Sequence, residues 1–263
     1  MAFRKLAALA LTMSFALAGC GGGSGAEDDL DSLFRGFSSG DADNPAGMWI
    51  GKIPGNLSPD LQVVVQEDGT YWAMYGKIVD NALTVDAFLP GTFVGHMGQL
   101  RSFDLRDFHR DGIYYTGNMR ATHLSGASIV GSAYGDKASI NFSLAPSTTF
   151  NTNTPALAAN IEGAWTMFLF DSHFLTTAVN ITANGALTGT SGTCTITGTV
   201  VHSASGKNRY DVTTTYGAGC VQANMTTSGI AIWQRLPNSS SAQLIMTTIN
   251  PTRTFGTVLS GIR

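Results

Sequence analysis

The chain has 263 residues, enough for two small domains, and 43% of them are hydrophobic, so it can bury a core rather than stay disordered. Only 13% are charged, with 15 basic and 18 acidic side chains, and glycine is abundant at 31 residues. This composition is typical of a β-rich exported protein, and it offers no basic surface for nucleic acid.

The first twenty residues have the three-part order of an export signal. Arg4 and Lys5 form a positive start, the run 6–17 is mostly apolar, and the small pair Ala18-Gly19 precedes Cys20. An apolar run of about a dozen residues is too short to cross a hydrocarbon core, which needs roughly 20. The segment therefore predicts export rather than a transmembrane helix.

The segment Leu17-Ala18-Gly19-Cys20 resembles the lipobox of bacterial lipoproteins. The resemblance implies a signal peptide at 1–19 and acyl chains, palmitate among them, on Cys20. Gly21 is not Asp, so the family pattern favours the outer membrane, at its periplasmic face or at the cell surface. An ordinary secretory signal or a retained membrane anchor is the alternative.

Export would change the charge of the chain. Arg4 and Lys5 are lost with the signal, which leaves 13 basic and 18 acidic side chains and a net charge of −5. A mildly acidic protein is not drawn to anionic lipid by its overall charge. We therefore expect the N-terminal lipid to be its link to the membrane.

Residues 20–45 are predicted to be a flexible tether, because they are rich in glycine, serine and acidic side chains. Leu30, Leu33, Phe34 and Phe37 stand at helical spacing and would allow a short docking peg. We favour the simpler interpretation, a solvated spacer.

The body of the chain carries an internal repeat. Three pairs of marks recur at an offset of 116 residues: Gly47-Met48-Trp49 with Gly163-Ala164-Trp165, Asp68-Gly69 with Asn184-Gly185, and Gly76 with Gly192. The repeat predicts two homologous domains at 46–147 and 160–263. The polar, proline-containing segment 148–159 would be a linker that permits limited motion between them.

Short strand-like runs dominate both domains, and no stretch has the pattern of a long amphipathic helix. Asp68-Gly69 and Asn184-Gly185 predict hairpins with type I′ turns. We therefore predict an all-β fold of two tandem small antiparallel β-barrels or compact sandwiches. The expected strands lie at 61–66, 82–89, 92–96, 100–108, 112–119, 127–132 and 138–144, and then at 178–182, 194–202, 209–215, 223–227, 229–235, 242–249 and 254–259.

The two Gly-x-Trp motifs, with Trp49 and Trp165, are similar to the motif that opens lipocalins and other calycin barrels. In that family the tryptophan closes one barrel end beneath a basic side chain from a late strand. The resemblance implies that Arg253 or Arg263 covers Trp165 and that Lys137 covers Trp49. It also implies a role in binding, while both tryptophans are structural core residues.

The cysteines form a pair once Cys20 is assigned to the lipid. Cys194 and Cys220 remain, an even number in an oxidising compartment, so we predict a disulfide. Two separately buried thiols are the alternative. Neither cysteine has a CxxC partner or a histidine at ligand spacing, so no metal site is predicted.

Four aromatic residues are candidates for ligand or partner contact. Tyr71 and Trp72 are adjacent, as are Tyr114 and Tyr115. Successive side chains of a strand point to opposite faces, so one member of each pair should face away from the barrel interior. An outward ring is where a partner would dock.

Motifs for catalysis are not evident. The histidines show no metal-binding spacing, and no glycine loop leads into a helix to hold a phosphate, so no cofactor is predicted. The charged stretch 104–111 is interpreted as a solvated hairpin with exposed ion pairs. Inward carboxylates, or a histidine with an aspartate partner in a cleft, would instead favour an enzyme.

The function predicted from these features is a non-enzymatic binding or interaction module of the cell envelope, held by its N-terminal lipid. Its partner would be an envelope protein or a small ligand of unknown identity. The alternatives are a structural or assembly lipoprotein of the outer membrane and a small-molecule-processing enzyme.

Overall fold

The computed structural model describes residues 33–38, 41, 43–110, 112–135, 139–170 and 175–263. The signal segment, Cys20 and most of the predicted tether lie outside the described residues, as does Lys137. Phe34–Arg263 form one compact unit, separate from Met1–Leu33, and the description below concerns that unit. The described part contains no helix with the length and apolarity needed to span a bilayer.

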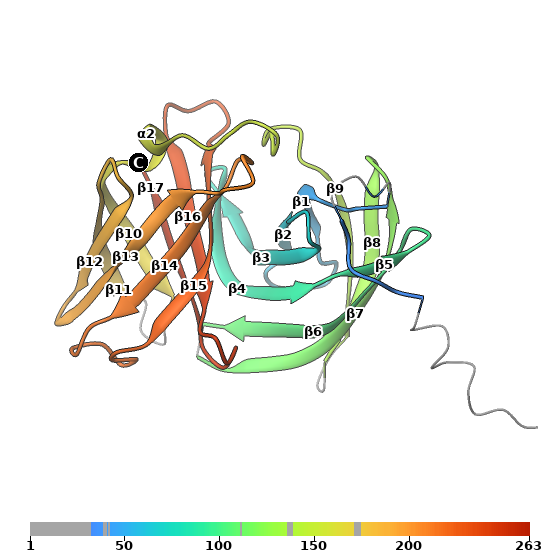
Figure 1. Cartoon of the computed structure of the whole chain (residues 1–263), viewed down its shortest axis with the longest axis horizontal. Helices are drawn as coiled ribbons and strands as arrows, with labels where there is room; N and C mark the ends of the chain where they lie inside the picture. The colour runs from blue at the N-terminus through green and yellow to red at the C-terminus, as the bar shows by residue number, and fades with distance from the viewer. Residues whose placement is uncertain (1–32, 39–40, 42, 111, 136–138, 171–174) are drawn as a thin grey trace, which may run out of the picture. The chain divides into compact units, whose positions relative to one another are not determined.

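The first half of the body is a closed antiparallel barrel, here called barrel 1 (Figure 1). Its sheet order is β4-β3-β2-β1-β9-β8-β7-β6-β5, and pairing of β4 with β6 closes eight strands into the barrel, with β5 as an additional short strand. The strands are β1 (Gly47–Lys52), β2 (Asp60–Val65), β3 (Thr70–Val79), β4 (Ala82–Thr92), β5 (Val94–His96), β6 (Gln99–His109), β7 (Tyr114–Leu124), β8 (Ser128–Gly135) and β9 (Ser139–Pro146).

The second half is a closed eight-stranded barrel in sequential order, here called barrel 2. A short helix, α2 (Ala158–Ile161), precedes it. Its strands are β10 (Gly163–Phe170), β11 (Leu175–Ile181), β12 (Ala186–Ser191), β13 (Cys194–His202), β14 (Tyr210–Tyr216), β15 (Thr226–Arg235), β16 (Ala242–Ile249) and β17 (Gly256–Ile262). The prediction of two tandem barrels is therefore confirmed.

Two of the three repeat marks correspond in the structure. Trp49 and Trp165 lie on the first strands, and the Nε1 of each donates to the carbonyl four residues earlier, 2.8 Å away in both barrels. Gly69 and Gly185 follow the second strands with φ of 87° and 82°. Gly76, by contrast, lies within β3, whereas Gly192 is in the turn after β12, so that coincidence was wrong.

The predicted turn type was also wrong. Only the glycines of Asp68-Gly69 and Asn184-Gly185 have positive φ, whereas a type I′ turn needs positive φ at both central residues. That condition is met instead at Asp80-Asn81, between β3 and β4, and at Met97-Gly98, between β5 and β6. The Asp-Gly and Asn-Gly pairs do sit in hairpins, but with a glycine that ends a wider turn.

Residues 226–227 of the predicted strand 223–227 join the predicted strand 229–235 in one continuous strand, β15, whereas 223–225 precede it and are not strand. Gly229 does not interrupt it, because the glycine is paired with Thr248. A Cβ on Gly229 would lie 1.9 Å from the carbonyl oxygen of Thr247, so the residue permits close approach of two strands rather than a break.

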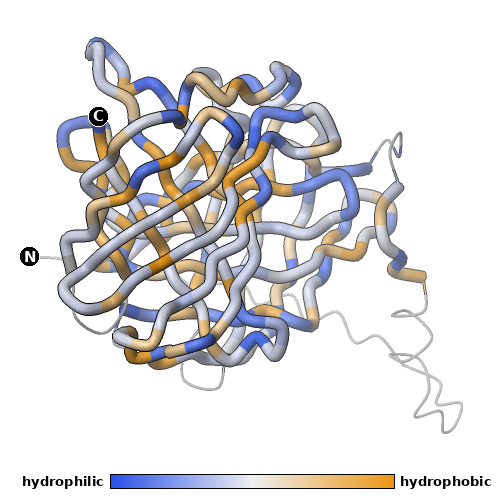
Figure 2. The backbone as a smooth tube through the Cα atoms, turned by 60° about the vertical axis from the view of Figure 1, so that its left-hand side comes forward, coloured by the Kyte–Doolittle hydropathy of each residue, from blue (hydrophilic) through white to orange (hydrophobic). Residues whose placement is uncertain are grey.

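The barrels share an apolar interface. In β2, Leu61, Val63 and Val65 belong to the interior of barrel 1, while Val64 belongs to a second cluster that includes residues of barrel 2. The apolar residues of β2 are therefore buried on both faces of the strand, and every residue of β2 is buried. Figure 2 shows hydrophobic residues distributed along the strands and many of the hydrophilic ones in loops. The segment 148–159 is therefore not the only connection between the barrels.

Polar contacts also join the barrels. Gln243 on β16 accepts from the Leu83 amide at 3.0 Å and donates to the Leu83 carbonyl at 2.8 Å, and so pairs the edge of β4 as a neighbouring strand would. Arg209 meets Glu67 at 3.1 Å. These contacts satisfy backbone and charged groups beside the apolar interface.

Candidate functional site

The four predicted contact aromatics occupy different environments. Tyr71 is fully buried inside barrel 1, and its hydroxyl lies 3.0 Å from Ser102 Oγ. Trp72 faces outward, as the alternation predicted, but it is buried in the cluster that joins the barrels. The partner that covers this outward ring is barrel 2 of the same chain.

Tyr114 and Tyr115 also point in opposite directions. The Tyr114 ring packs beside Phe108, with ring centroids 5.6 Å apart, and belongs to the same inter-barrel cluster. Tyr115 instead lines a pocket at one end of barrel 1. Of the four, Tyr115 is the residue that remains a candidate for ligand contact.

The pocket has a volume of about 280 Å³ and lies at the end of barrel 1 where β6 finishes. We call this the open end. Besides apolar residues of β4, β6, β8 and β9, it is lined by Asn56, Tyr75, Asp107, His109, Tyr115, Thr116 and Tyr134. A concave site with a few polar groups that converge on an apolar wall is typical of small-molecule binding.

Three side chains from β3 and β6 are linked at this end. The Tyr75 hydroxyl donates to Asp107, with O···O distances of 3.0 and 3.3 Å, and lies 3.4 Å from His109 Nε2. His109 Nε2 is 2.9 Å from Asp107 Oδ2. The Tyr115 ring meets the His109 ring edge to face at 5.3 Å.

Burial governs the ionisation of the Tyr75 phenol. It raises the pKa of the Tyr75 phenol well above its usual value, and the negative charge of Asp107, which also accepts the phenol hydrogen bond, raises it further. Tyr75 therefore stays protonated at neutral pH and acts as a donor. The Asp107 carboxylate accepts from Tyr75 and also contacts His109 Nε2, and its two oxygens have further acceptor positions for a bound molecule.

The opposite end of barrel 1 is closed. Trp49 plugs it, and the His123 ring lies edge-on to that tryptophan with centroids 5.6 Å apart. Phe37 packs against the core, and a Cβ on Gly95 would lie 2.2 Å from its ring. The apolar cavity within the barrel holds about 20 Å³, room for about one water molecule. A ligand would therefore occupy the open end and not the barrel axis.

The position of Phe37 corrects the interpretation of the tether. Arg35 bridges to Gly95 through backbone hydrogen bonds of 2.9 and 3.4 Å, and Phe37 docks beside it. Arg35 and Phe37, within the predicted spacer, therefore contact barrel 1, but through a β-bridge rather than a helical turn, and Leu33 of the expected peg is 49% exposed. Glycines at 69 and 95 leave the room that the phenyl ring occupies.

In barrel 2 the basic residue over the tryptophan is Arg263, whose guanidinium carbon lies 4.1 Å from the centre of the Trp165 ring. Arg253, the other candidate, instead contacts Asp104 of barrel 1 at 2.7 Å. Trp49 and Trp165 are both buried in barrel interiors. Their predicted place in the core is thus the one they occupy.

The charged stretch 104–111 is not a solvated hairpin over its described residues. Asp104 bonds Arg253 of barrel 2, and Arg110 pairs with Asp86 at 3.0 Å. Burial would raise the pKa of Asp104, but hydrogen bonds from Arg253, Thr92 and Ser102 hold it below its usual value. The prediction of a solvated hairpin was wrong because the charged partners of Asp104 and Arg110 come from distant segments of the chain.

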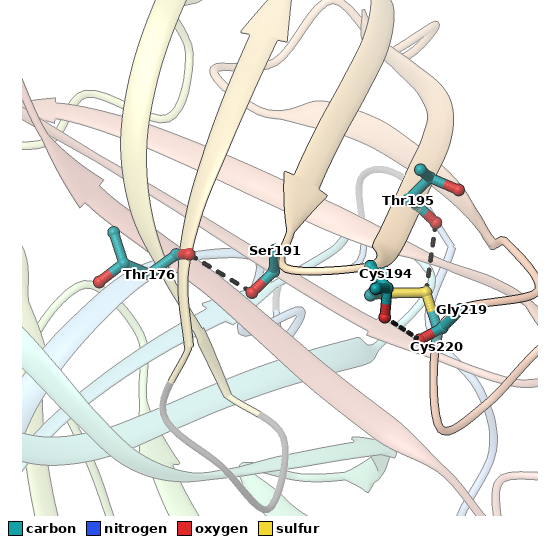
Figure 3. Close-up of a disulfide and its surroundings, with 7 residues drawn as sticks. Thr176, Ser191, Cys194, Thr195, Gly219 and Cys220 are labelled. Atoms are coloured by element: carbon teal, nitrogen blue, oxygen red, sulfur yellow. Dashed lines mark hydrogen bonds between the residues drawn. A yellow bond between two sulfur atoms is a disulfide. The ribbon is translucent and has the colours of Figure 1, made fainter.

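The predicted disulfide is confirmed between Cys194 and Cys220 (Figure 3). Cys194 begins β13, and Cys220 lies in the loop between β14 and β15. Gly217 N donates to the Thr195 carbonyl at 2.7 Å, so the same loop is also held by backbone bonding. The bond is structural and lies in barrel 2, whereas the pocket lies in barrel 1.

Sequence reasoning identified Tyr115 but missed its neighbours. Leu105, Asp107 and His109 alternate, so they share one face of β6, and Leu105 belongs to the barrel interior. That period of two was a usable signal for the inward direction of Asp107 and His109. Nothing local connects them with Tyr75, which is 32 residues from Asp107.

A second depression, of about 550 Å³, lies between the barrels and is lined by β4, β10 and β17 together with Arg110 and Gln243. Within the described residues, no three His, Cys, Asp or Glu side chains are grouped as metal ligands would be.

Comparisons of this chain with protein-family models, curated proteins and solved structures gave no match.

Proposed function

We propose that this protein is a lipid-anchored binding module of the cell envelope that holds a small molecule in the pocket at the open end of barrel 1. The observation that carries the proposal is the inward cluster of Tyr75, Asp107 and His109 at the mouth of an otherwise filled barrel. A carboxylate that lines a concave, largely apolar site is the kind of polar group by which such sites orient a ligand. A binding site gives that carboxylate a role.

The chemistry of the pocket restricts the ligand. Asp107 accepts hydrogen bonds, and Tyr115 offers a ring that packs on an apolar face. With a volume of about 280 Å³, the pocket lies at the small end of the range for ligand sites. The ligand is therefore a compact molecule with hydrogen-bond donors on one side and carbon on the other.

A ligand screen with the whole chain tests this assignment. The whole chain is needed because the barrels share a buried apolar interface. The probes are monosaccharides, free amino acids and small organic amines. A ligand at about 100 times its dissociation constant stabilises the native state by about 2.7 kcal/mol, which raises the melting temperature by several degrees.

The matched variants are Tyr115→Ala, which removes a ring from the pocket, and Phe168→Ala, which removes an exposed ring from β10. We expect the stabilising probe to act on wild type and on Phe168→Ala but not on Tyr115→Ala. A probe that stabilises all three proteins equally binds elsewhere and contradicts the assignment, as does a screen without any stabilising probe.

The anchor is tested at Cys20. If the lipobox assignment holds, Cys20→Ala moves the protein from the membrane fraction to the soluble fraction, because a chain without its acyl groups keeps no strong attachment. Ser24→Ala, in the same spacer, should leave the distribution unchanged. Continued recovery of Cys20→Ala with membranes after a salt wash would rule out the lipid anchor.

An enzyme of acid-base chemistry is the second candidate. It is favoured by the 2.9 Å contact of His109 with Asp107 inside a pocket, the arrangement expected of a general base. The raised pKa of Tyr75 argues against a nucleophilic phenol. Release of a chemically altered probe by wild type, and its loss in Asp107→Asn, would favour this candidate over binding alone. A structural or assembly role stays a prediction.

A further inference from the structure

Two hairpin tips at the closed end of barrel 1 carry exposed apolar side chains. Met97, between β5 and β6, is 79% exposed, and Leu124, at the end of β7, is 64% exposed. The tips are neighbours, because the His123 amide donates to the Gly98 carbonyl at 2.7 Å. Met97 has a φ of 49°, a conformation usual for glycine or asparagine. Neither the turn geometry nor contact with water accounts for a methionine there.

Two arginines stand directly opposite each other beside these tips. Arg101 on β6 is paired in register with Arg120 on β7, and both lie on the outer face of the sheet. Like charges in opposed positions destabilise a strand pair. Arg101 also stacks over Phe34, with its guanidinium carbon 4.5 Å from the ring centre. Both guanidinium groups bring positive charge to this face.

The N-terminal segment joins the body at the same place. Arg35 bridges to Gly95, two residues before Met97, and the Phe34 ring lies 6.3 Å from the His96 ring. Figure 1 shows the first described residues beside β5, on the side of barrel 1 away from barrel 2. If residues 20–33 form the flexible tether that the sequence predicts, their root-mean-square span is about 20 Å. A lipid on Cys20 would hold this end close to the bilayer.

We propose that the closed end of barrel 1 lies against an anionic lipid bilayer, with Arg101 and Arg120 contacting lipid phosphates and Met97 and Leu124 reaching the acyl boundary. The inference rests on the lipid anchoring proposed above. Arginines near an anionic surface and apolar tips at the headgroup boundary both favour membrane contact. An anionic bilayer offers phosphates to the arginines and an acyl boundary to the apolar tips at the same time. It is therefore the partner that matches this surface.

The overall charge of −5 does not prevent this contact. Charges on exposed surfaces act over about 8–10 Å at physiological ionic strength, so the charges near this face, rather than the net charge of the whole protein, govern the contact. Arg35 is not part of the proposed contact, because its charge already acts on Asp41. The pKa of that carboxyl is lowered by hydrogen bonds from Ser38 and also by the charge of Arg35. The pocket at the open end would then face away from the bilayer.

Hydrogen exchange of the lipidated full mature protein on vesicles tests the inference. The vesicles contain phosphatidylcholine alone or phosphatidylcholine with phosphatidylglycerol. We expect amides of segments 94–101 and 120–128 to exchange several-fold more slowly on the anionic vesicles, and salt at about 1 M to remove the difference. Equal exchange on both vesicles would overturn the inference.

Two pairs of variants sharpen the result. Arg120→Ser and Leu124→Ser should lose the protection, while Lys77→Ser and Leu57→Ser should keep it. Lys77 and Leu57 are exposed residues near the open end of the same barrel, and Leu57 is 87% exposed. Protection that persists in Arg120→Ser and Leu124→Ser would refute the assignment of these residues. Protein that floats with vesicles without protection contradicts this inference alone, whereas protein that does not float contradicts the anchor.

Discussion

Phe88→Ala is expected to lower the free energy of unfolding by about 3–5 kcal/mol, the usual cost of removing a buried phenyl ring. Phe88 on β4 is fully buried and points out of barrel 1. It stacks on Phe108 at 5.1 Å and meets Phe170 of barrel 2 at 6.3 Å. Truncation would open a cavity between the barrels, and chemical denaturation followed by tryptophan fluorescence measures the loss.

Phe103→Ala is the matched control, because the same atoms are removed from a ring that is 54% exposed on β6. Its effect should stay within about 0.5 kcal/mol. We also expect wild type to unfold in one transition, since each barrel covers an apolar face of the other. Two separate transitions in wild type, or equal effects of the two variants, would contradict a shared core.

Loss of the Cys194–Cys220 disulfide is expected to cost roughly 3 kcal/mol. The bond joins residues 26 apart, and a cross-link of this span restricts the unfolded chain by about that amount. The double variant Cys194→Ser/Cys220→Ser removes it without leaving a free thiol at either position. Its denaturation midpoint should fall while the native far-UV spectrum is retained, because the loop after β14 keeps the backbone hydrogen bond from Gly217 to Thr195.

A reductant supplies the control for this prediction. Reduced wild type should match the double variant in stability, and the reductant should leave the double variant itself unchanged. If reduction destabilises both proteins equally, the effect does not come from this bond. If the double variant is as stable as wild type, the bond does not restrict the unfolded chain.

The sequence was most informative where a signal was local or repeated. Trp49 and Trp165 marked equivalent first strands, because each follows a glycine and opens a run of alternating residues. The glycines of Asp68-Gly69 and Asn184-Gly185 marked equivalent hairpins, although not the turn type. The turn type depends on the φ of both central residues, and a dipeptide compatible with one geometry can adopt another.

The candidate site was less accessible. Tyr115 was identified by its adjacency to Tyr114, but the pocket also needs Tyr75 on β3 and Asp107 on β6. Those strands are not adjacent in the sheet, and their side chains meet only because the barrel closes. A bulge between Ser102 and Leu105 also changes which residues of β6 face inward. Closure and register are set by the whole sheet, so local patterns do not reveal them.

The sequence by itself determined the all-β class, two tandem domains with a structural tryptophan in each, and the pairing of Cys194 with Cys220, because strand period, repeat offset and cysteine number are properties of the chain. It left open whether each domain is a closed barrel or a compact sandwich, and the structure shows barrels. The tertiary structure alone decided that Trp72 and Phe88 face barrel 2 and that Asp107 faces Tyr75. An outward apolar residue looks the same in the sequence whether water, a membrane or a second barrel covers it. Only the packing of distant segments decides which.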